Sequence, residues 1–199
     1  MSLARHAFVT CKDETPPNEM NRVNRITDYT AKNRIMTSSD TEAEKLKIPL
    51  DLSEWCPKET LLAWVKEELE ALNWANPELI AHLHAHPAYQ PRMWLSLLTF
   101  GYATSVFESE EIVRLCYVDH LFQALCAEAV PSPRALSRFR RDNRGLLKWL
   151  LSQILKRALR EKFALGDALL PAGVRRFLLE TANVRLDIAR HVDRAAQGA

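Results

Sequence analysis

Residues 132–160 read SPRALSRFRRDNRGLLKWLLSQILKRALR, and this stretch decides the fold because two helices can be derived from it directly. Ser132 is a good N-cap residue, and Pro133 suits the first position of a helix. The pattern predicts one helix over 133–143. After a glycine that loosens its end, leucines at helical spacing predict a second, longer helix over 146–163.

The first of these helices is predicted to have two different faces. At about 100° per residue, Leu136, Phe139 and Asn143 share one side of it. The opposite side carries a hydroxyl and three guanidinium groups, from Arg134, Ser137, Arg138 and Arg141. We therefore expect a helix that packs through apolar residues and presents positive charge to its surroundings.

The rest of the chain is also predicted to be helical. Only 5 glycines occur in 199 residues, and alternating β-branched runs that would indicate strands are few. Apolar residues at helical spacing, with caps and prolines at the boundaries, predict helices over 57–73, 76–86, 92–106, 110–117, 119–127 and 173–196. The predicted fold class is all-α.

Three regions are expected along the chain. Residues 1–47 are polar, lack apolar periodicity and are predicted to be a mostly disordered arm. Residues 48–163 hold the predicted helical domain. Residues 164–199 form a helical extension, whose apolar stripe suits a partner helix in the same chain or in a second copy.

Charge is divided unevenly along the chain, although the net charge is only +2. Residues 51–130 contain four Lys or Arg against twelve Asp or Glu, whereas 131–162 contain ten against two. An acidic body therefore precedes a strongly basic segment. Such a segment favours a polyanion as partner.

The sequence supports a cytoplasmic location, associated with the nucleoid if DNA is the partner. The first residues carry charges where a signal peptide needs an apolar core, and no apolar run is long enough for a membrane span. Cys11, Cys56, Cys116 and Cys126 are far apart in the sequence, which is typical of reduced thiols in a cytosol.

No motif for catalysis or cofactor binding is found. His82, His84 and His86 form an H-x-H-x-H run, but Pro87 interrupts any helix there and no further ligand completes a closed metal shell. The chain has no phosphate-binding glycine loop and no nucleophile elbow. We expect no catalytic residue, no metal and no cofactor.

The segment from 119 to 143 has the dimensions of a helix-turn-helix, whose second helix would lie in a DNA major groove. Arginine forks pair with phosphates or with guanine edges, and hydroxyl groups add further contacts. Solvated arginines on a surface helix are the alternative interpretation. The residues predicted to contact double-stranded DNA are Ser132, Arg134, Ser137, Arg138, Arg140, Arg141, Arg144 and Lys148.

Residues 86–158 resemble the amino-terminal domain of InsH-type insertion-sequence transposases. The matching pieces are Pro87-Ala-Tyr89, Pro91-Arg-Met93, Gly101-Tyr-Ala-Thr104, Ile112 to Cys116 with Asp119, and Ser137-Arg-Phe-Arg-Arg141; the stretch from Asp51 to Trp55, followed by Pro57, resembles the opening of the same domain. The resemblance implies a helical DNA-binding module that precedes a ribonuclease-H-like catalytic domain, in which an acidic triad of Asp, Asp and Glu binds two divalent metals.

The chain departs from that family after residue 158, where 41 residues remain and their pattern is helical. Asp167 stands in no stretch that matches the motif of the first catalytic aspartate. The resemblance therefore transfers no residue of the acidic triad, and we expect a protein that is not itself an enzyme.

Three functions remain open at this stage. The first is DNA binding by a transposase-derived domain, in a truncated or domesticated form. The second is a helical interaction module, for instance a homodimer formed through the C-terminal helix. The third is the first-frame subunit of a split transposase.

The arm leads to a direct prediction. Removing residues 1–45 should leave a cooperatively folding helical protein, because this segment lacks the apolar periodicity needed to join a core. Thermal melting followed by circular dichroism measures this. Loss of the cooperative transition in the shortened chain would show that the arm is structural.

Overall fold

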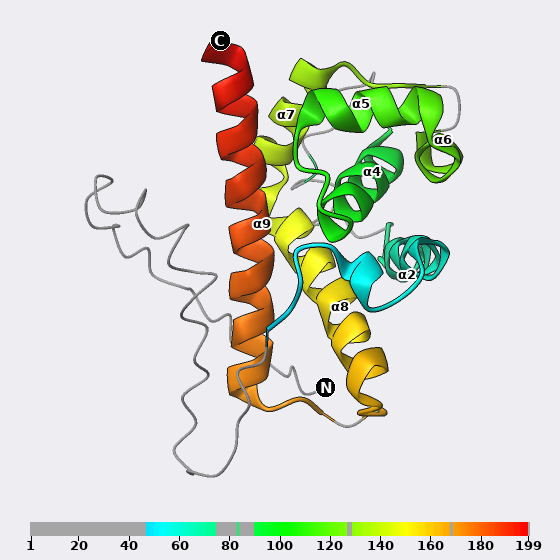
Figure 1. Ribbon diagram of the computed structural model, residues 1–199, viewed down its shortest axis with the longest axis vertical. Coiled ribbons are helices and arrows are strands. Elements are labelled where there is room, and N and C mark those ends of the chain that lie inside the picture. The colour runs from blue at the N-terminus through cyan, green and yellow to red at the C-terminus, as the bar shows by residue number, and fades with distance from the viewer. Residues whose placement is uncertain (1–46, 75–82, 84–89, 127–128, 168, 199) are drawn as a thin grey trace, which may run out of the picture. The chain divides into compact units, whose positions relative to one another are not determined.

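The computed structural model describes residues 47–74, 83, 90–126, 129–167 and 169–198 (Figure 1). The arm predicted over 1–47 therefore lies outside the described residues except for its last residue. The helix predicted over 76–86 lies outside them too, apart from Leu83, which is buried.

The described residues form α-helices and no strand, which confirms the all-α prediction. After a short 3-10 helix, η2 (Leu52–Glu54), come α2 (Lys58–Glu70), α4 (Pro91–Ala103), α5 (Ser109–Val118), α6 (His120–Cys126), α7 (Pro133–Asp142), α8 (Arg144–Phe163) and α9 (Ala172–Gly198). None of these helices is both long and apolar enough to cross a membrane.

Helix α4 occupies the centre of the core. Every residue from Met93 to Ala103 is buried, and the helix packs against α2, α6 and α8. It ends three residues earlier than predicted, because Ser105 adopts a left-handed conformation with φ 64°. Gly101 allows α5 to approach closely, since a Cβ there would lie 3.2 Å from the Ile112 side chain.

Helix α9 packs along α8 within the same chain (Figure 1). Its buried stripe consists of Leu178, Ala182, Leu186 and Ala189. The sequence left open whether this stripe meets its own chain or a second copy. The structure places it against its own chain, so the segment predicted as an extension is built into the helical body.

Arg185 of α9 is the largest fully buried side chain among the described residues. Its guanidinium donates to the carbonyl oxygens of Pro49 at 2.5 Å, Leu50 at 2.7 Å and Tyr102 at 2.5 Å. Burial lowers the pKa of Arg185 to about 10, so the group remains charged at neutral pH. This side chain ties α9 both to the segment before η2 and to the end of α4.

Replacing Arg185 by methionine should lower the free energy of unfolding by at least about 3 kcal/mol. The substitution keeps a long apolar stem but leaves several buried carbonyl groups without a donor, each costing about 1–3 kcal/mol. Urea unfolding measures the change. Arg176→Met is the matched control, because Arg176 lies on the same helix and its side chain is 83% exposed; it should stay within about 0.5 kcal/mol of the parent. Equal stabilities of the two variants would contradict the stabilising role of the Arg185 hydrogen bonds.

Candidate nucleic-acid interface

Helix α7 forms as the sequence predicts. Ser132 is its N-cap, and the hydroxyl accepts a hydrogen bond from the Ala135 amide at 3.3 Å. Leu136 and Phe139 are buried, and the Phe139 ring lies edge-on to Trp94 of α4 with 5.3 Å between ring centroids. Packing on this side fixes which face of α7 points away from the core.

The outward face of α7 carries Arg134, Arg138 and Arg141, all of them exposed. The side chains of Arg138 and Arg141 are 69% and 73% exposed. Both approach Asp142, whose carboxylate lies 3.7 Å from Arg138 Nε and 3.1 Å from Arg141 Nε. Exposed pairs of this kind contribute little to stability, so they hold the guanidiniums only loosely. One carboxylate against three guanidiniums leaves this face positive.

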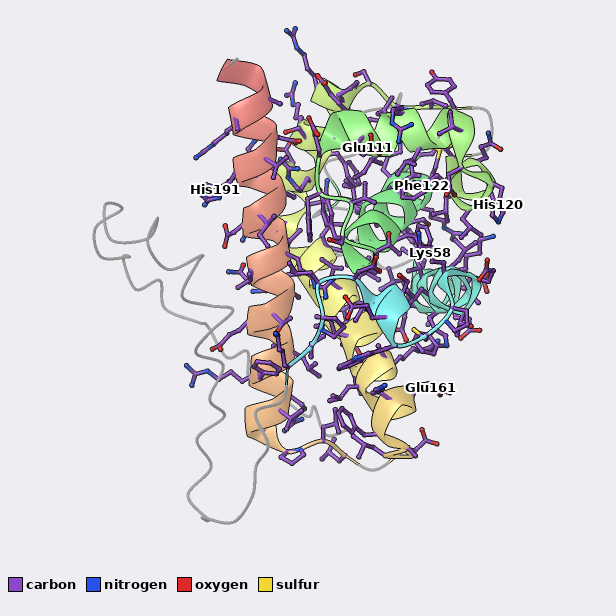
Figure 2. All side chains as sticks on the ribbon, in the orientation of Figure 1. Lys58, Glu111, His120, Phe122, Glu161 and His191 are labelled. Carbon is purple, nitrogen blue, oxygen red and sulfur yellow. The ribbon has the colours of Figure 1, made fainter. Side chains whose placement is uncertain are left out.

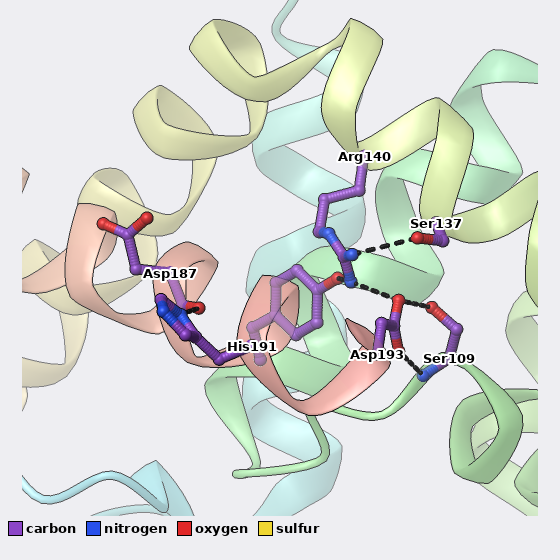
Figure 3. A network of polar contacts seen from close by, with 7 residues as sticks. Ser109, Ser137, Arg140, Asp187, His191 and Asp193 are labelled. Carbon is purple, nitrogen blue, oxygen red and sulfur yellow. Dashed lines mark hydrogen bonds and ion pairs between the residues drawn. The ribbon is translucent and has the colours of Figure 1, made fainter. Parts of the chain in front are cut away.

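Arg140 is different, because its side chain is only 6% exposed. The guanidinium lies 2.8 Å from the carboxylate of Asp193 on α9, donates to the Tyr102 hydroxyl at 3.2 Å, and donates to Ser137 Oγ at 3.1 Å (Figure 3). Arg140 is therefore not on the exposed face of α7, although the sequence placed it among the predicted DNA contacts. In this conformation its charge is paired inside the protein.

The same carboxylate also holds the start of α5. Asp193 accepts hydrogen bonds from the Ser109 amide at 2.8 Å and from the Ser109 hydroxyl at 2.6 Å (Figure 3). Ser109 is the first residue of α5, and the oxygen that accepts a hydrogen bond from its amide comes from α9. A negative charge at a helix N-terminus is also favourable for the helix dipole. We call Tyr102, Ser109, Arg140 and Asp193 the α9 network.

The α9 network joins four helices, α4, α5, α7 and α9. Burial raises the pKa of Tyr102 above its ordinary value, and the nearby Arg140 only partly opposes that shift. The phenol therefore stays neutral over the whole physiological range. Sequence reasoning missed Asp193, although a carboxylate within the apolar stripe of an amphipathic helix signals a buried charged partner.

The remaining predicted contact residues lie beside α7. Arg144 begins α8, and its Nη2 lies 3.2 Å from Asp187 and 2.7 Å from the Asn183 side-chain oxygen on α9. Lys148 is partly exposed one turn later. The hydroxyl of Ser132 serves as a cap, and that of Ser137 accepts from Arg140. Arg134, Arg138 and Arg141 therefore share an outward face, with Arg144 and Lys148 following on α8.

The structure does not confirm the helix-turn-helix predicted over 119–143. Helix α7 packs against α5, whereas α6 packs against α5 and α4, and α6 and α7 are not among the closely packed pairs. The basic helix α7 thus belongs to a bundle in which α5 contacts both α6 and α7.

No metal centre is found within the described ranges. Groups of three or more His, Cys, Asp or Glu residues that could hold a metal ion do not occur there. Titratable residues such as Glu111, His120, Glu161 and His191 lie on four different helices (Figure 2). The histidine run at 82–86 lies outside the described residues.

The three described cysteines are buried thiols. Cys56, Cys116 and Cys126 are free. Burial raises the pKa of Cys56 to about 11 and that of Cys116 to about 12. These two thiols therefore stay protonated and poorly nucleophilic at neutral pH.

One family model matches part of the chain. The family model described as Transposase domain (DUF772) matches residues 50–142. The match confirms the resemblance to transposase amino-terminal domains and ends with the last residue of α7. No curated protein and no solved structure shows significant similarity to the chain.

The neighbouring residues Arg140 and Arg141 make a matched pair for testing the two environments on α7. Arg140→Ala should destabilise the fold by about 3–5 kcal/mol, because it leaves the Asp193 carboxylate buried without its cationic partner. Arg141→Ala should change stability by no more than about 0.5 kcal/mol, because its guanidinium is exposed. Chemical denaturation of both variants measures the difference. A small effect of Arg140→Ala would mean that the buried ion pair is not maintained in solution.

Proposed function

We propose that this chain binds double-stranded DNA, proceeding from the match of residues 50–142 to the family model described as Transposase domain (DUF772). The outward face of α7 is the proposed contact surface. The observation that carries the proposal is the set of three exposed arginines, Arg134, Arg138 and Arg141, on the side of α7 opposite its buried residues.

The setting of α7 supports this role. A side chain that reads or grips DNA acts best from a rigid element, since less freedom is lost on binding. Helix α7 is capped by Ser132, packed through Phe139 and tied to α9 through Arg140. The exposed arginines of α7 therefore project from a helix that three separate contacts hold in place.

Arginine suits DNA for a chemical reason. Its planar fork pairs with two phosphate oxygens, or with O6 and N7 of one guanine, and it keeps its charge at every physiological pH. A helix fits a B-DNA major groove, which is about 12 Å wide. Loose pairing of Arg138 and Arg141 with the exposed Asp142 leaves these forks available for exchange to phosphate.

The charge distribution orients the protein on the polyanion. Helix α5 begins with Glu110 and Glu111, and α2 carries Glu59, Glu67, Glu68 and Glu70. These faces are repelled by phosphates, whereas α7 and the start of α8 are attracted. The proposed role is DNA binding, and no catalytic residue is carried over from the family. A nucleoid-associated location is part of the same proposal.

The test replaces Arg134, Arg138 and Arg141 together by alanine. Duplex binding should weaken by at least about tenfold at 0.15 M salt, and the slope of log K against log salt should fall by about 0.9 for each phosphate that the variant no longer neutralises. Fluorescence anisotropy with a labelled mixed-sequence duplex, at several salt concentrations, measures both quantities. The melting temperature should stay close to that of the parent.

The control variant loses the same charge: Arg114, Arg175 and Arg176, which are exposed on α5 and α9, are replaced together by alanine. This variant should retain most of the affinity. If the α7 variant bound duplex as tightly as the parent, α7 would not be the contact helix, and a protein-interaction role would be favoured.

A further inference from the structure

Two arginines from different helices share one carboxylate beside α7. Arg144 Nη2 of α8 and Arg190 Nη2 of α9 lie 3.2 Å and 3.1 Å from the same oxygen, Asp187 Oδ1. The three side chains are 34%, 42% and 32% exposed, respectively. Arg144 Nη2 also donates to the Asn183 side-chain oxygen at 2.7 Å. Two guanidiniums on one carboxylate leave a net positive charge at this partly exposed cluster.

The position of Arg190 around α9 places it on the side of α8. Angles around the axis of α9 can be counted from Asp193, which faces Arg140, at about 100° per residue. On this scale Arg190 lies at about 60° and Arg194 at about 100°. Asn183 and Asp187, at about 80° and 120°, lie in the same sector. Because Arg144 contacts Asn183 and Asp187, this sector is the one next to the start of α8.

The basic face of α7 turns toward the same side. Around the axis of α7, counted from Arg140, Ser137 lies at about 60° and Arg141 at about 100°. Arg140 meets Asp193 and Arg144 meets Asp187, so α7 and the start of α8 run opposite to α9. For antiparallel helices, equal rotations in the same sense lead to the same side of the pair.

We propose that Arg144, Arg190 and Arg194 form a second binding site for DNA backbone phosphate, continuous with the outward face of α7. The inference rests on the proposed DNA binding and adds α9 to its contact surface. Arg194 is exposed, and at its rotation it extends the shared pair by one helical turn. Three guanidiniums against the single carboxylate of Asp187 give this site a net charge suited to phosphate.

The alternative is that the Asp187 cluster merely fastens α8 to α9. A tether of that kind needs only one guanidinium opposite the carboxylate, and Arg144 already spans the two helices. Arg190 lies on the same helix as Asp187, at i+3, so it adds nothing to a link between helices. Its addition makes sense if the cluster presents positive charge to a ligand.

The first experiment replaces Arg190 and Arg194 by glutamine in the full chain. Affinity for a labelled mixed-sequence duplex should fall by about tenfold at 0.15 M salt, and the salt slope should decrease by about one to two units. The matched control is the double replacement of Arg175 and Arg176 by glutamine, which removes the same charge near the other end of α9. The affinity of the control should fall by less than about twofold.

The second experiment uses Asp187→Asn, for which the two interpretations predict opposite signs. If the cluster is a phosphate site, removing the shared carboxylate releases two guanidiniums and tightens duplex binding severalfold. If it is only a tether, duplex affinity stays unchanged or falls. Circular dichroism melts of each variant confirm that the folded state is being compared.

The outcomes separate this inference from the proposed function. Loss of binding in the α7 variant, with parental binding by the Arg190/Arg194 variant, would overturn the α9 site and leave α7 as the contact helix. Equal decreases in affinity in the Arg190/Arg194 variant and its control would also overturn the site, because they would reflect overall charge alone. Failure of the parent protein to bind duplex at low salt would refute the proposed function itself.

Discussion

The buried ion pair between Arg140 and Asp193 is the interaction on which the arrangement of the helices depends. Removing two charges from water is costly, and their attraction offsets that cost only when the remaining donors and acceptors are also satisfied. Here Tyr102 and Ser109 complete the hydrogen bonding, so the pair is held within a network. Because Arg140 lies on α7 and Asp193 on α9, the orientation of the basic helix is fixed from the far end of the chain.

Helix α9 therefore completes the helical domain, although the family match ends at residue 142, before α9 begins. Arg185 holds the segment around Pro49 and the end of α4, while Asp193 holds α5 and α7. Both side chains act on residues within or next to 50–142, and neither lies in the matched range. In physical terms, the helical body of this protein extends through α9. Its buried stripe, formed by Leu178, Ala182, Leu186 and Ala189, packs within that body.

The arginines of the short basic helix α7 therefore fall into two groups, one buried and one exposed. Arg140 stabilises the fold, and its neighbours Arg138 and Arg141 remain in solvent, where charge is available for a polyanion. The acidic helices α2 and α5 carry the opposite charge. This segregation gives the molecule an electrostatic direction that a net charge of +2 conceals.

The sequence by itself determined the helical class, the limits of most helices to within a few residues, and the two faces of α7. These properties follow from local spacing, since Leu136 and Phe139 repeat with the period of a helix whatever surrounds them. Spacing did not reveal that Arg140 is buried, because it lies at the border between the two faces. It also suggested a helix-turn-helix over 119–143, which the structure does not confirm. Only the tertiary structure brought Asp193 to Arg140, because a buried charge is tolerated solely where a distant part of the chain supplies its partner.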